Sequence, residues 1–143
     1  ARTGLDLYRY IARDRSLMTQ NPHIIIVDDE APAREMVGDY LKMHGFSVTL
    51  CDGGKSLRGA IENGVPDLVV LDLDLPHLNG VELTAAVRGI PHLEKVPIVV
   101  ITGHGGSADW RVLQKFGADG FLMKPVDAYA LVALARRALE KKP

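Results

Sequence analysis

Cysteine is scarce in this sequence, since its 143 residues include one, Cys51. A lone cysteine excludes an internal disulfide framework and indicates a reducing compartment, in which the thiol packs as a small buried hydrophobe. A chain of this length buries roughly two thirds of the surface that its unfolded form exposes, so its core requires neither disulfides nor a structural metal. These features predict a single globular domain.

Long apolar runs are also missing. No stretch reaches the roughly 20 residues that a membrane-spanning helix needs, and the N-terminus lacks the uninterrupted apolar segment of a secretory signal. We therefore expect a cytoplasmic protein that does not enter a membrane.

Excess charge of one sign is absent, because 17 Lys and Arg face 18 Asp and Glu. Proteins bind a phosphate backbone mainly through lysine and arginine, so this balance argues against direct contact of the domain with nucleic acid. Metal-ligand spacing is absent among four of the five histidines, which we interpret as ordinary residues: His23, His44, His77 and His92.

Residues 1–20 differ from the rest and are predicted to be an N-terminal extension to a domain that covers 21–143. Met18 stands just ahead of a polar loop and the first apolar run, as a native start would. We therefore favour residues 1–17 as vector-derived or as a gene start placed too far upstream. The alternative is a short amphipathic helix, with Leu7, Tyr8 and Ile11 on one side, that docks on the domain or on a second copy.

From residue 21 onward, short apolar runs alternate with helical patterns. The apolar runs cover residues 23–27, 46–51, 67–73, 96–102 and 119–124. Strands that are apolar throughout are covered on both faces, as in a parallel sheet between helices. The helical patterns cover residues 31–45, 53–65, 79–90, 105–118 and 126–142, and three end at Gly45, Gly64 and Gly117. Five strand–helix units predict an α/β fold with a doubly wound parallel sheet.

Polar side chains stand at the carboxyl ends of four predicted strands: Asp28, Asp29, Asp72, Thr102 and Lys124. In a doubly wound sheet, functional groups lie outside these ends, so we expect the five side chains to meet in one crevice. The alternative for Asp28 and Asp29 alone is a polar cap on the following helix. The presence of Asp72, Thr102 and Lys124 makes that alternative weak.

Carboxylates gathered in this way repel one another by about 3 kcal/mol per pair at an effective dielectric constant near 20. A divalent cation relieves this repulsion, and a site with oxygen ligands but neither His nor Cys points to Mg²⁺. Such a site, with the Lys124 ammonium, the Thr102 hydroxyl and one carboxylate free to attack, is equipped to accept a phosphoryl group.

The order of these motifs resembles that of the receiver domain of two-component response regulators. The motifs are "VDDE", "LVVLDLDLPHLNG", "IVVITGHGG" and "GADGFLMKP", and the match covers nearly the whole chain after Met18. The resemblance implies a flavodoxin-like (βα)5 fold with five strands in the order 2-1-3-4-5. It also implies a phosphoprotein of phosphorelay signal transduction that catalyses its own phosphorylation and dephosphorylation.

Carried over to this sequence, the resemblance implies that Asp72 is phosphorylated by a phosphohistidine of a sensor histidine kinase. Mg²⁺ would be bound by Asp72, by Asp29 directly, by Asp28 mainly through water, and by the main-chain carbonyl of Asp74. Lys124 would pair with the phosphoryl oxygens.

The same resemblance implies a cis peptide bond between Lys124 and Pro125 and a two-state switch. On phosphorylation Thr102 would turn to the phosphoryl group and Phe121 would turn inward. The change would be read on the face made by the fourth helix, fifth strand and fifth helix, and would control an output domain or a partner.

Two side chains near the site are candidate modulators. Asp74 follows the predicted phosphoacceptor, and we leave the role of its side chain open because an acid in a loop is usually solvated. His104 lies two residues after Thr102, where it would affect the access of water to a phosphoryl group. An ordinary solvated loop histidine is an equal interpretation of His104.

Apolar residues outside the expected buried stripes suggest an interface with a partner or a second copy. On the fourth helix we take Ala108, Val112 and Phe116 as buried, which places Trp110 toward the outer side. On the last helix we take Val126, Ala130 and Leu134 as buried. A second stripe remains, and it makes the interface candidates Tyr129, Val132 and Leu139. The alternative is scattered surface apolarity, which is normal.

The stretch "VVLDLDL" also fits the first motif of the haloacid dehalogenase phosphatases, with Asp72 as nucleophile and Asp74 as general acid. Thr102 and Lys124 would be the second and third motifs. That family places its metal-binding acids after the lysine, whereas here the acidic pair precedes Asp72. The phosphatase is therefore the less favoured alternative. A degenerate receiver that only binds partners is disfavoured because Asp72 and Lys124 are both present.

Overall fold

The computed structural model describes residues 4, 21–74, 79–103 and 110–140. The segment for which a helix with Leu7, Tyr8 and Ile11 was the alternative interpretation therefore lies outside the described residues, as do His77, His104 and Ala108. No described helix combines the length and the apolarity that crossing a membrane requires.

The described strands form one parallel sheet in the order β2-β1-β3-β4-β5, which confirms the predicted topology. The strands are β1 His23–Val27, β2 Ser47–Cys51, β3 Leu68–Asp72, β4 Ile98–Thr102 and β5 Gly120–Met123. The helices in the described part of the chain are α3 Ala31–Met43, α4 Gly54–Glu62, α5 Gly80–Arg88, α6 Trp110–Lys115 and α7 Ala128–Glu140.

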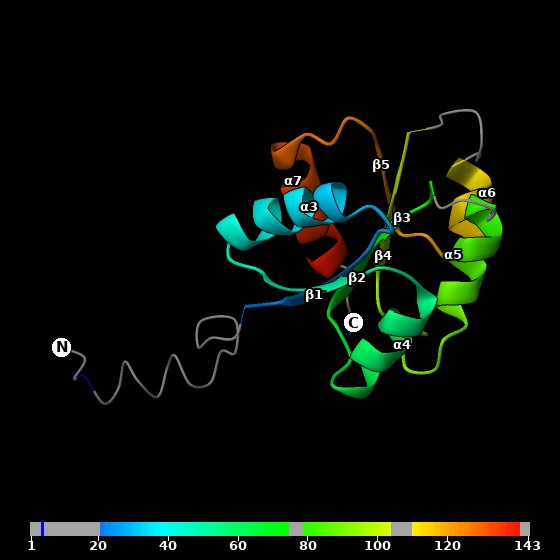
Figure 1. Ribbon diagram of the computed structural model, residues 1–143, viewed down its shortest axis with the longest axis horizontal. Helices are drawn as coiled ribbons and strands as arrows, with labels where there is room; N and C mark the ends of the chain where they lie inside the picture. Colours follow the sequence, from blue (N-terminus) through cyan, green and yellow to red (C-terminus); the bar gives the residue numbers. More distant parts are fainter. Residues whose placement is uncertain (1–3, 5–20, 75–78, 104–109, 141–143) are drawn as a thin grey trace.

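The helices cover both faces of the sheet (Figure 1). Helices α3 and α7 pack on one face over a core that includes Leu41 and Leu131. Helices α4, α5 and α6 pack on the other face over a core that includes Leu57 and Leu113. Because successive strands are joined through helices, every strand points the same way, and all carboxyl ends lie at one edge of the sheet.

Strand β2 departs from the expectation that every strand is covered on both faces. Ser47 is exposed and Leu50 is 37% exposed. The reason is its position, since β2 is an edge strand that pairs only with β1. Cys51, at its end, is buried as predicted.

The predicted buried faces of α6 and α7 were wrong in part. On α6 the fully buried residue is Leu113, while Val112 and Phe116 are 38% and 42% exposed. Of the residues predicted to be buried on the last helix, Ala130 is exposed, whereas Val126 and Leu134 are partly buried against the core. The buried residues of α7 are Leu131, Val132, Ala135 and Ala138. Helix α7 packs against α3 as well as the sheet, so its buried stripe is wider than one row of side chains.

Candidate functional site

The site is built at the carboxyl edge of the sheet around an ion pair between the buried Asp72 and the partly exposed Lys124. Asp72, the last residue of β3, is 5% exposed, and its Oδ2 lies 2.9 Å from Nζ of Lys124. Lys124 follows β5 directly, so strand order brings the two together across the end of β4. Its peptide bond to Pro125 is cis, as the resemblance implied.

Asp28 supplies a second buried carboxylate beside Asp72. It follows β1, is 4% exposed, and its Oδ1 accepts the main-chain N–H of Glu30 at 2.9 Å. Burial is the main reason that the pKa of Asp28 rises to about 6; the Glu30 amide opposes this rise, and the Asp72 charge adds to it. Asp28 and Asp72 thus repel each other in a poorly solvated place.

Asp74 connects the third, fourth and fifth strand ends. Its Oδ1 accepts the Thr102 hydroxyl at 3.0 Å, and its Oδ2 accepts the main-chain N–H of Gly103 at 2.6 Å. The same Oδ2 lies 3.2 Å from Nζ of Lys124. The main-chain N–H of Asp74 donates to Oδ1 of Asp72 at 2.9 Å, so the two aspartates are tied to each other as well.

Lys124 therefore faces two carboxylates. Burial lowers the pKa of the Lys124 ammonium, but the hydrogen bonds and negative charges of Asp72 and Asp74 outweigh burial and raise that pKa above its ordinary value. The ammonium remains charged at neutral pH and offsets part of the negative charge of the site.

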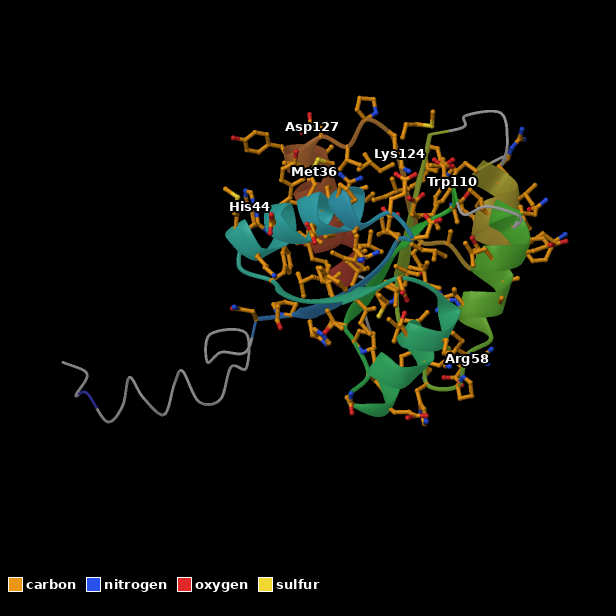
Figure 2. The ribbon with its side chains drawn as sticks, in the orientation of Figure 1. Met36, His44, Arg58, Trp110, Lys124 and Asp127 are labelled. Atoms are coloured by element: carbon orange, nitrogen blue, oxygen red, sulfur yellow. The ribbon has the colours of Figure 1, made fainter. Side chains whose placement is uncertain are left out.

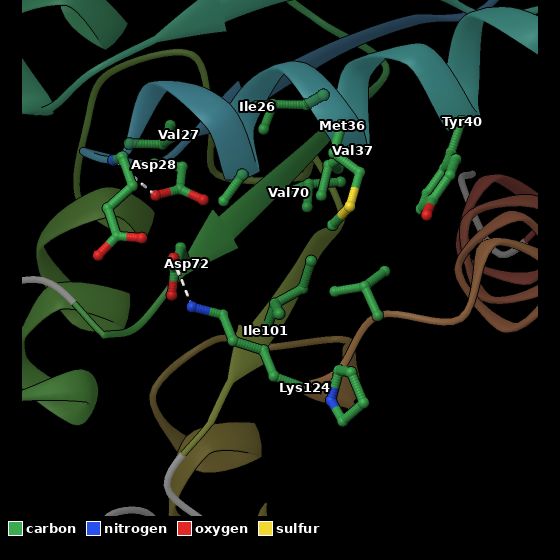
Figure 3. A pocket seen from close by; sticks show the side chains of 14 residues that line it. Ile26, Val27, Asp28, Met36, Val37, Tyr40, Val70, Asp72, Ile101 and Lys124 are labelled. Atoms are coloured by element: carbon green, nitrogen blue, oxygen red, sulfur yellow. Dashed lines mark hydrogen bonds and ion pairs between the residues drawn. The ribbon is translucent and has the colours of Figure 1, made fainter.

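A cavity of about 410 Å³ opens beside this pair (Figure 3). Asp28, Asp72 and Lys124 lie at one end, and Met36 and Tyr40 of α3 lie toward the other. Most of its lining between these ends is apolar, including Ile26, Val37, Val70, Ile101, Pro125 and Val126. The apolar walls reduce the water that reaches the carboxylates, which strengthens the electrostatic interactions there.

The two carboxylates of Asp28 and Asp72 form a donor set that fits Mg²⁺. Asp28 and Asp72 are adjacent and short of positive charge, and Mg²⁺ commonly takes one or two carboxylates and keeps several waters. In the described part of the chain, no group of three or more His, Cys, Asp or Glu side chains is close enough together to hold a metal ion. Asp29 is exposed and does not line the cavity, so its direct ligation of a metal stays a prediction.

The predicted switch residues point to the same face of the paired strands β4 and β5, because Phe121 pairs with Val100 and Thr102 lies two positions after Val100. Thr102, at the end of β4, is 1% exposed and engages Asp74. Phe121 of β5 is partly buried, and its ring centroid lies 5.7 Å from that of Trp110. Trp110 is labelled on α6 in Figure 2. Trp110 thus packs against the core rather than standing outside it. The movement of Thr102 and Phe121 stays a prediction.

The interface candidates on α7 need a correction. Tyr129 is 80% exposed, but Val132 is 4% exposed and belongs to the core between α7, α3 and the sheet. Leu139 is partly buried against that core. Val132 faces inward because it lies one position after Leu131, within the wide buried stripe of α7.

Two residues of the site were missed in the sequence. Gly103 donates its main-chain N–H to Asp74, and Arg34 donates from Nη1 to the main-chain carbonyl of Asp28 at 2.7 Å. The only sequence signal for Gly103 is its place directly after Thr102. Arg34 had no signal beyond its position in the first turn of a helix that follows the acidic pair.

Residues 24–136 match the family described as the response regulator receiver domain. The TorCAD operon transcriptional regulatory protein TorR of Escherichia coli (strain K12) is 33% identical over 117 residues, 82% of this chain and 50% of TorR. The DNA-binding response regulator MtrA of Mycobacterium tuberculosis (strain ATCC 25618 / H37Rv) is 34% identical over 123 residues, 86% of this chain and 53% of MtrA. This chain spans about half the length of these relatives.

Solved structures agree with the sequence matches. The receiver domain of the TMAO respiratory system response regulator TorR has a TM-score of 0.74 at 32% identity, covering 85% of this chain and 99% of that one. The chemotaxis response regulator CheY4 of Vibrio cholerae has a TM-score of 0.72 at 25% identity, covering 84% of this chain and 99% of that one. The family match, the relatives and the strand order agree, and the chain belongs to the receiver domain family of two-component response regulators.

Proposed function

We propose that this domain accepts a phosphoryl group on Asp72 in a Mg²⁺-dependent reaction, with a phosphohistidine of a sensor histidine kinase as the donor. The observation that carries the proposal is the buried Asp72 carboxylate, 2.9 Å from the Lys124 ammonium and beside the buried Asp28. Membership of the receiver family supports the same chemistry. The haloacid dehalogenase alternative has no comparable support.

In this proposal an oxygen of Asp72 attacks phosphorus, the phosphorus–nitrogen bond to the donor imidazole breaks, and the imidazole leaves with the bonding electrons. The Lys124 ammonium lies where it can neutralise charge on the phosphoryl oxygens. Asp28 and Asp72, with Asp29 as a further predicted ligand, would hold Mg²⁺, which would supply further neutralisation of the phosphoryl charge. Dephosphorylation is the attack of water on phosphorus, with Asp72 as the leaving group.

The output surface in this proposal is the face made by α6, β5 and α7. Four large apolar side chains on these elements or directly after α6 are at least 38% exposed: Val112, Phe116, Met123 and Tyr129. Phe121 and Trp110 pack beneath this face and next to the site, so a change at Thr102 has a short route to it. We propose that a second copy of the domain, in a homodimer, or an output domain binds this face. This binding would take place in the cytoplasm, where the kinase presents its phosphohistidine.

The test is intact mass after incubation with acetyl phosphate. The expected result is one added phosphoryl group in the wild type with Mg²⁺, and none in Asp72→Asn or with EDTA. An adduct that forms equally in Asp72→Asn excludes Asp72 as the acceptor. Steady release of phosphate without an adduct would instead support a phosphatase.

A further inference from the structure

The Asp74 carboxylate already binds the donors that a phosphoryl group on Asp72 would need. It accepts the Thr102 hydroxyl at 3.0 Å and the Gly103 amide at 2.6 Å, and it lies 3.2 Å from the Lys124 ammonium. These three donors come from β4, the residue after it and the residue after β5. Asp74 itself is held next to Asp72 by the hydrogen bond from its main-chain N–H.

A phosphoryl group brings three strong acceptor oxygens and its negative charge to the Asp72 carboxylate. Lys124 is the cation already paired with Asp72, and Thr102 is a buried hydroxyl at the next strand end. A carboxylate and a phosphoryl oxygen that approach the same donors repel each other and cannot both occupy the short contact with the Gly103 amide. One anion must therefore give way to the other.

We propose that Asp74 is a positioning residue that competes with the phosphoryl group for Thr102, Gly103 and Lys124. Before phosphorylation its carboxylate holds the three donors in place, and phosphorylation of Asp72 exchanges this carboxylate for phosphoryl oxygens. The inference rests on the proposed function of Asp72. It assigns to the Asp74 side chain a role that its position in a loop did not indicate.

Gly103 is the residue that permits this contact. A Cβ added to Gly103 would lie 3.0 Å from Oδ2 of Asp74, tighter than an ordinary contact. The substitution Gly103→Ala would push the carboxylate away without changing any charge. Asp74→Asn removes the charge and keeps the size of the side chain. The two variants therefore separate the hydrogen-bonded contact from the simple effect of charge.

The first measurement is the amide resonance of Gly103 in the unphosphorylated protein without Mg²⁺. A short hydrogen bond to a carboxylate shifts an amide proton downfield and slows its exchange with water. We expect both features in the wild type and their loss in Asp74→Asn and Gly103→Ala. Asp52→Asn is the matched control, because Asp52 is an exposed acid after β2 that bonds to Ser56. An unchanged Gly103 resonance in Asp74→Asn overturns the inference.

The second measurement is the rate of phosphorylation by acetyl phosphate with Mg²⁺. Asp74→Asn is expected to raise the rate about tenfold and Gly103→Ala about threefold, because each weakens a charge-assisted hydrogen bond of the resting state. The rate increase of the double variant should be smaller than the product of the two single increases, because both substitutions weaken the same contact. No gain in either single variant, or an equal gain in Asp52→Asn, overturns the competition.

The two measurements also distinguish this inference from the proposed function. If no form carries a phosphoryl group on Asp72, both the proposed function and the competition fail, and the Gly103 resonance still reports whether Asp74 binds the amide. If Asp72 is phosphorylated normally but Asp74→Asn is no faster, the function stands and the inference alone fails.

Discussion

The Lys124 ammonium lies 2.9 Å from the Asp72 carboxylate, although 52 positions separate the two residues in the sequence. Strand β4 lies between their strands in the sheet, so the pair forms across its end. Asp72 is 95% buried while 30% of the Lys124 side chain is exposed. The buried partner therefore depends on the pair more than the exposed one does.

Removal of Lys124 is expected to destabilise the domain through Asp72. In Lys124→Met the buried carboxylate loses its cation, and we expect the free energy of unfolding to fall by about 1–3 kcal/mol. In the double variant with Asp72→Asn, part of this loss should be recovered because Asp72 no longer carries an unpaired charge, while Asp74 still lacks its lysine. Urea denaturation in EDTA measures both effects. Equal losses in the single and the double variant would contradict the dependence of Asp72 on Lys124.

Asp28 is expected to make stability depend on pH between about 4 and 6. Its pKa in the folded protein is about 6, above the ordinary value of 3.8, so the folded state holds a proton that the unfolded state has lost. The free energy of unfolding without metal should therefore fall as the pH rises from about 4 to about 6. The charged groups that face Asp28 are Asp72, Lys124 and Glu30, which lie around the same cavity, and Arg34, which donates to the main-chain carbonyl of Asp28.

The difference between the wild type and Asp28→Asn isolates this effect. Asp52 and Glu94 have lowered pKa values, so they make the free energy of unfolding rise with pH. Their contribution is present in both proteins and cancels in the difference. Thermal or urea unfolding in EDTA at several pH values should show the wild type losing stability relative to Asp28→Asn as the pH rises through this range. Parallel curves for the two proteins would mean that Asp28 does not hold the extra proton.

The sequence predicted the strand ends well because a parallel sheet places them by chain order alone. Asp28, Asp72, Thr102 and Lys124 follow apolar runs, and strand order brings them to one edge. The contacts of Asp74 were not predictable in this way. They depend on the path of the loop after β3 and on the rotamer of one side chain, neither of which leaves a periodic signal. The faces of α7 were misjudged because that helix packs on two neighbours.

Arg88 is expected to be a large contributor to stability away from the site. It donates to the main-chain carbonyls of Leu93, Val96 and Gly117 at 2.6–2.7 Å, and it pairs with Asp119 at 2.8 Å. Arg88→Met leaves these acceptors without their donor, and we expect a loss of about 2–4 kcal/mol in the free energy of unfolding. Arg136→Met, at an exposed position of α7, is the control and should change stability by less than about 0.5 kcal/mol. Comparable losses in the two variants would contradict this role.

Two glycines after helices should respond differently to substitution by alanine. Gly45 and Gly117 both have positive φ, of 91° and 120°. A Cβ at Gly45 meets nothing within 4 Å, whereas a Cβ at Gly117 lies 2.9 Å from Nε of Arg88. Gly45→Ala should lower the free energy of unfolding by about 1 kcal/mol through backbone strain alone. Gly117→Ala should lower it further, because Arg88 must also move. Urea denaturation of both variants measures the two losses of stability. A smaller loss for Gly117→Ala than for Gly45→Ala would refute the prediction.

The exposed face of α6, β5 and α7 predicts that Tyr129 and Val132 behave differently when charged. Tyr129→Glu, at an 80% exposed position, should leave the free energy of unfolding within about 0.5 kcal/mol of the wild type. It should weaken self-association of the phosphorylated domain, measured by sedimentation, because it places a charge in the proposed interface. Val132→Glu buries an unpaired charge and should destabilise the fold by more than about 3 kcal/mol.

Met43→Glu is the matched control for Tyr129→Glu. Met43 is 78% exposed at the end of α3, outside the proposed interface, and the substitution adds the same charge to the surface. We expect it to leave sedimentation unchanged. Equal weakening by both variants would assign the effect to net charge rather than to a surface. A wild type that stays monomeric in both phosphorylation states would exclude the homodimer and leave an output domain as the reader of the exposed apolar side chains.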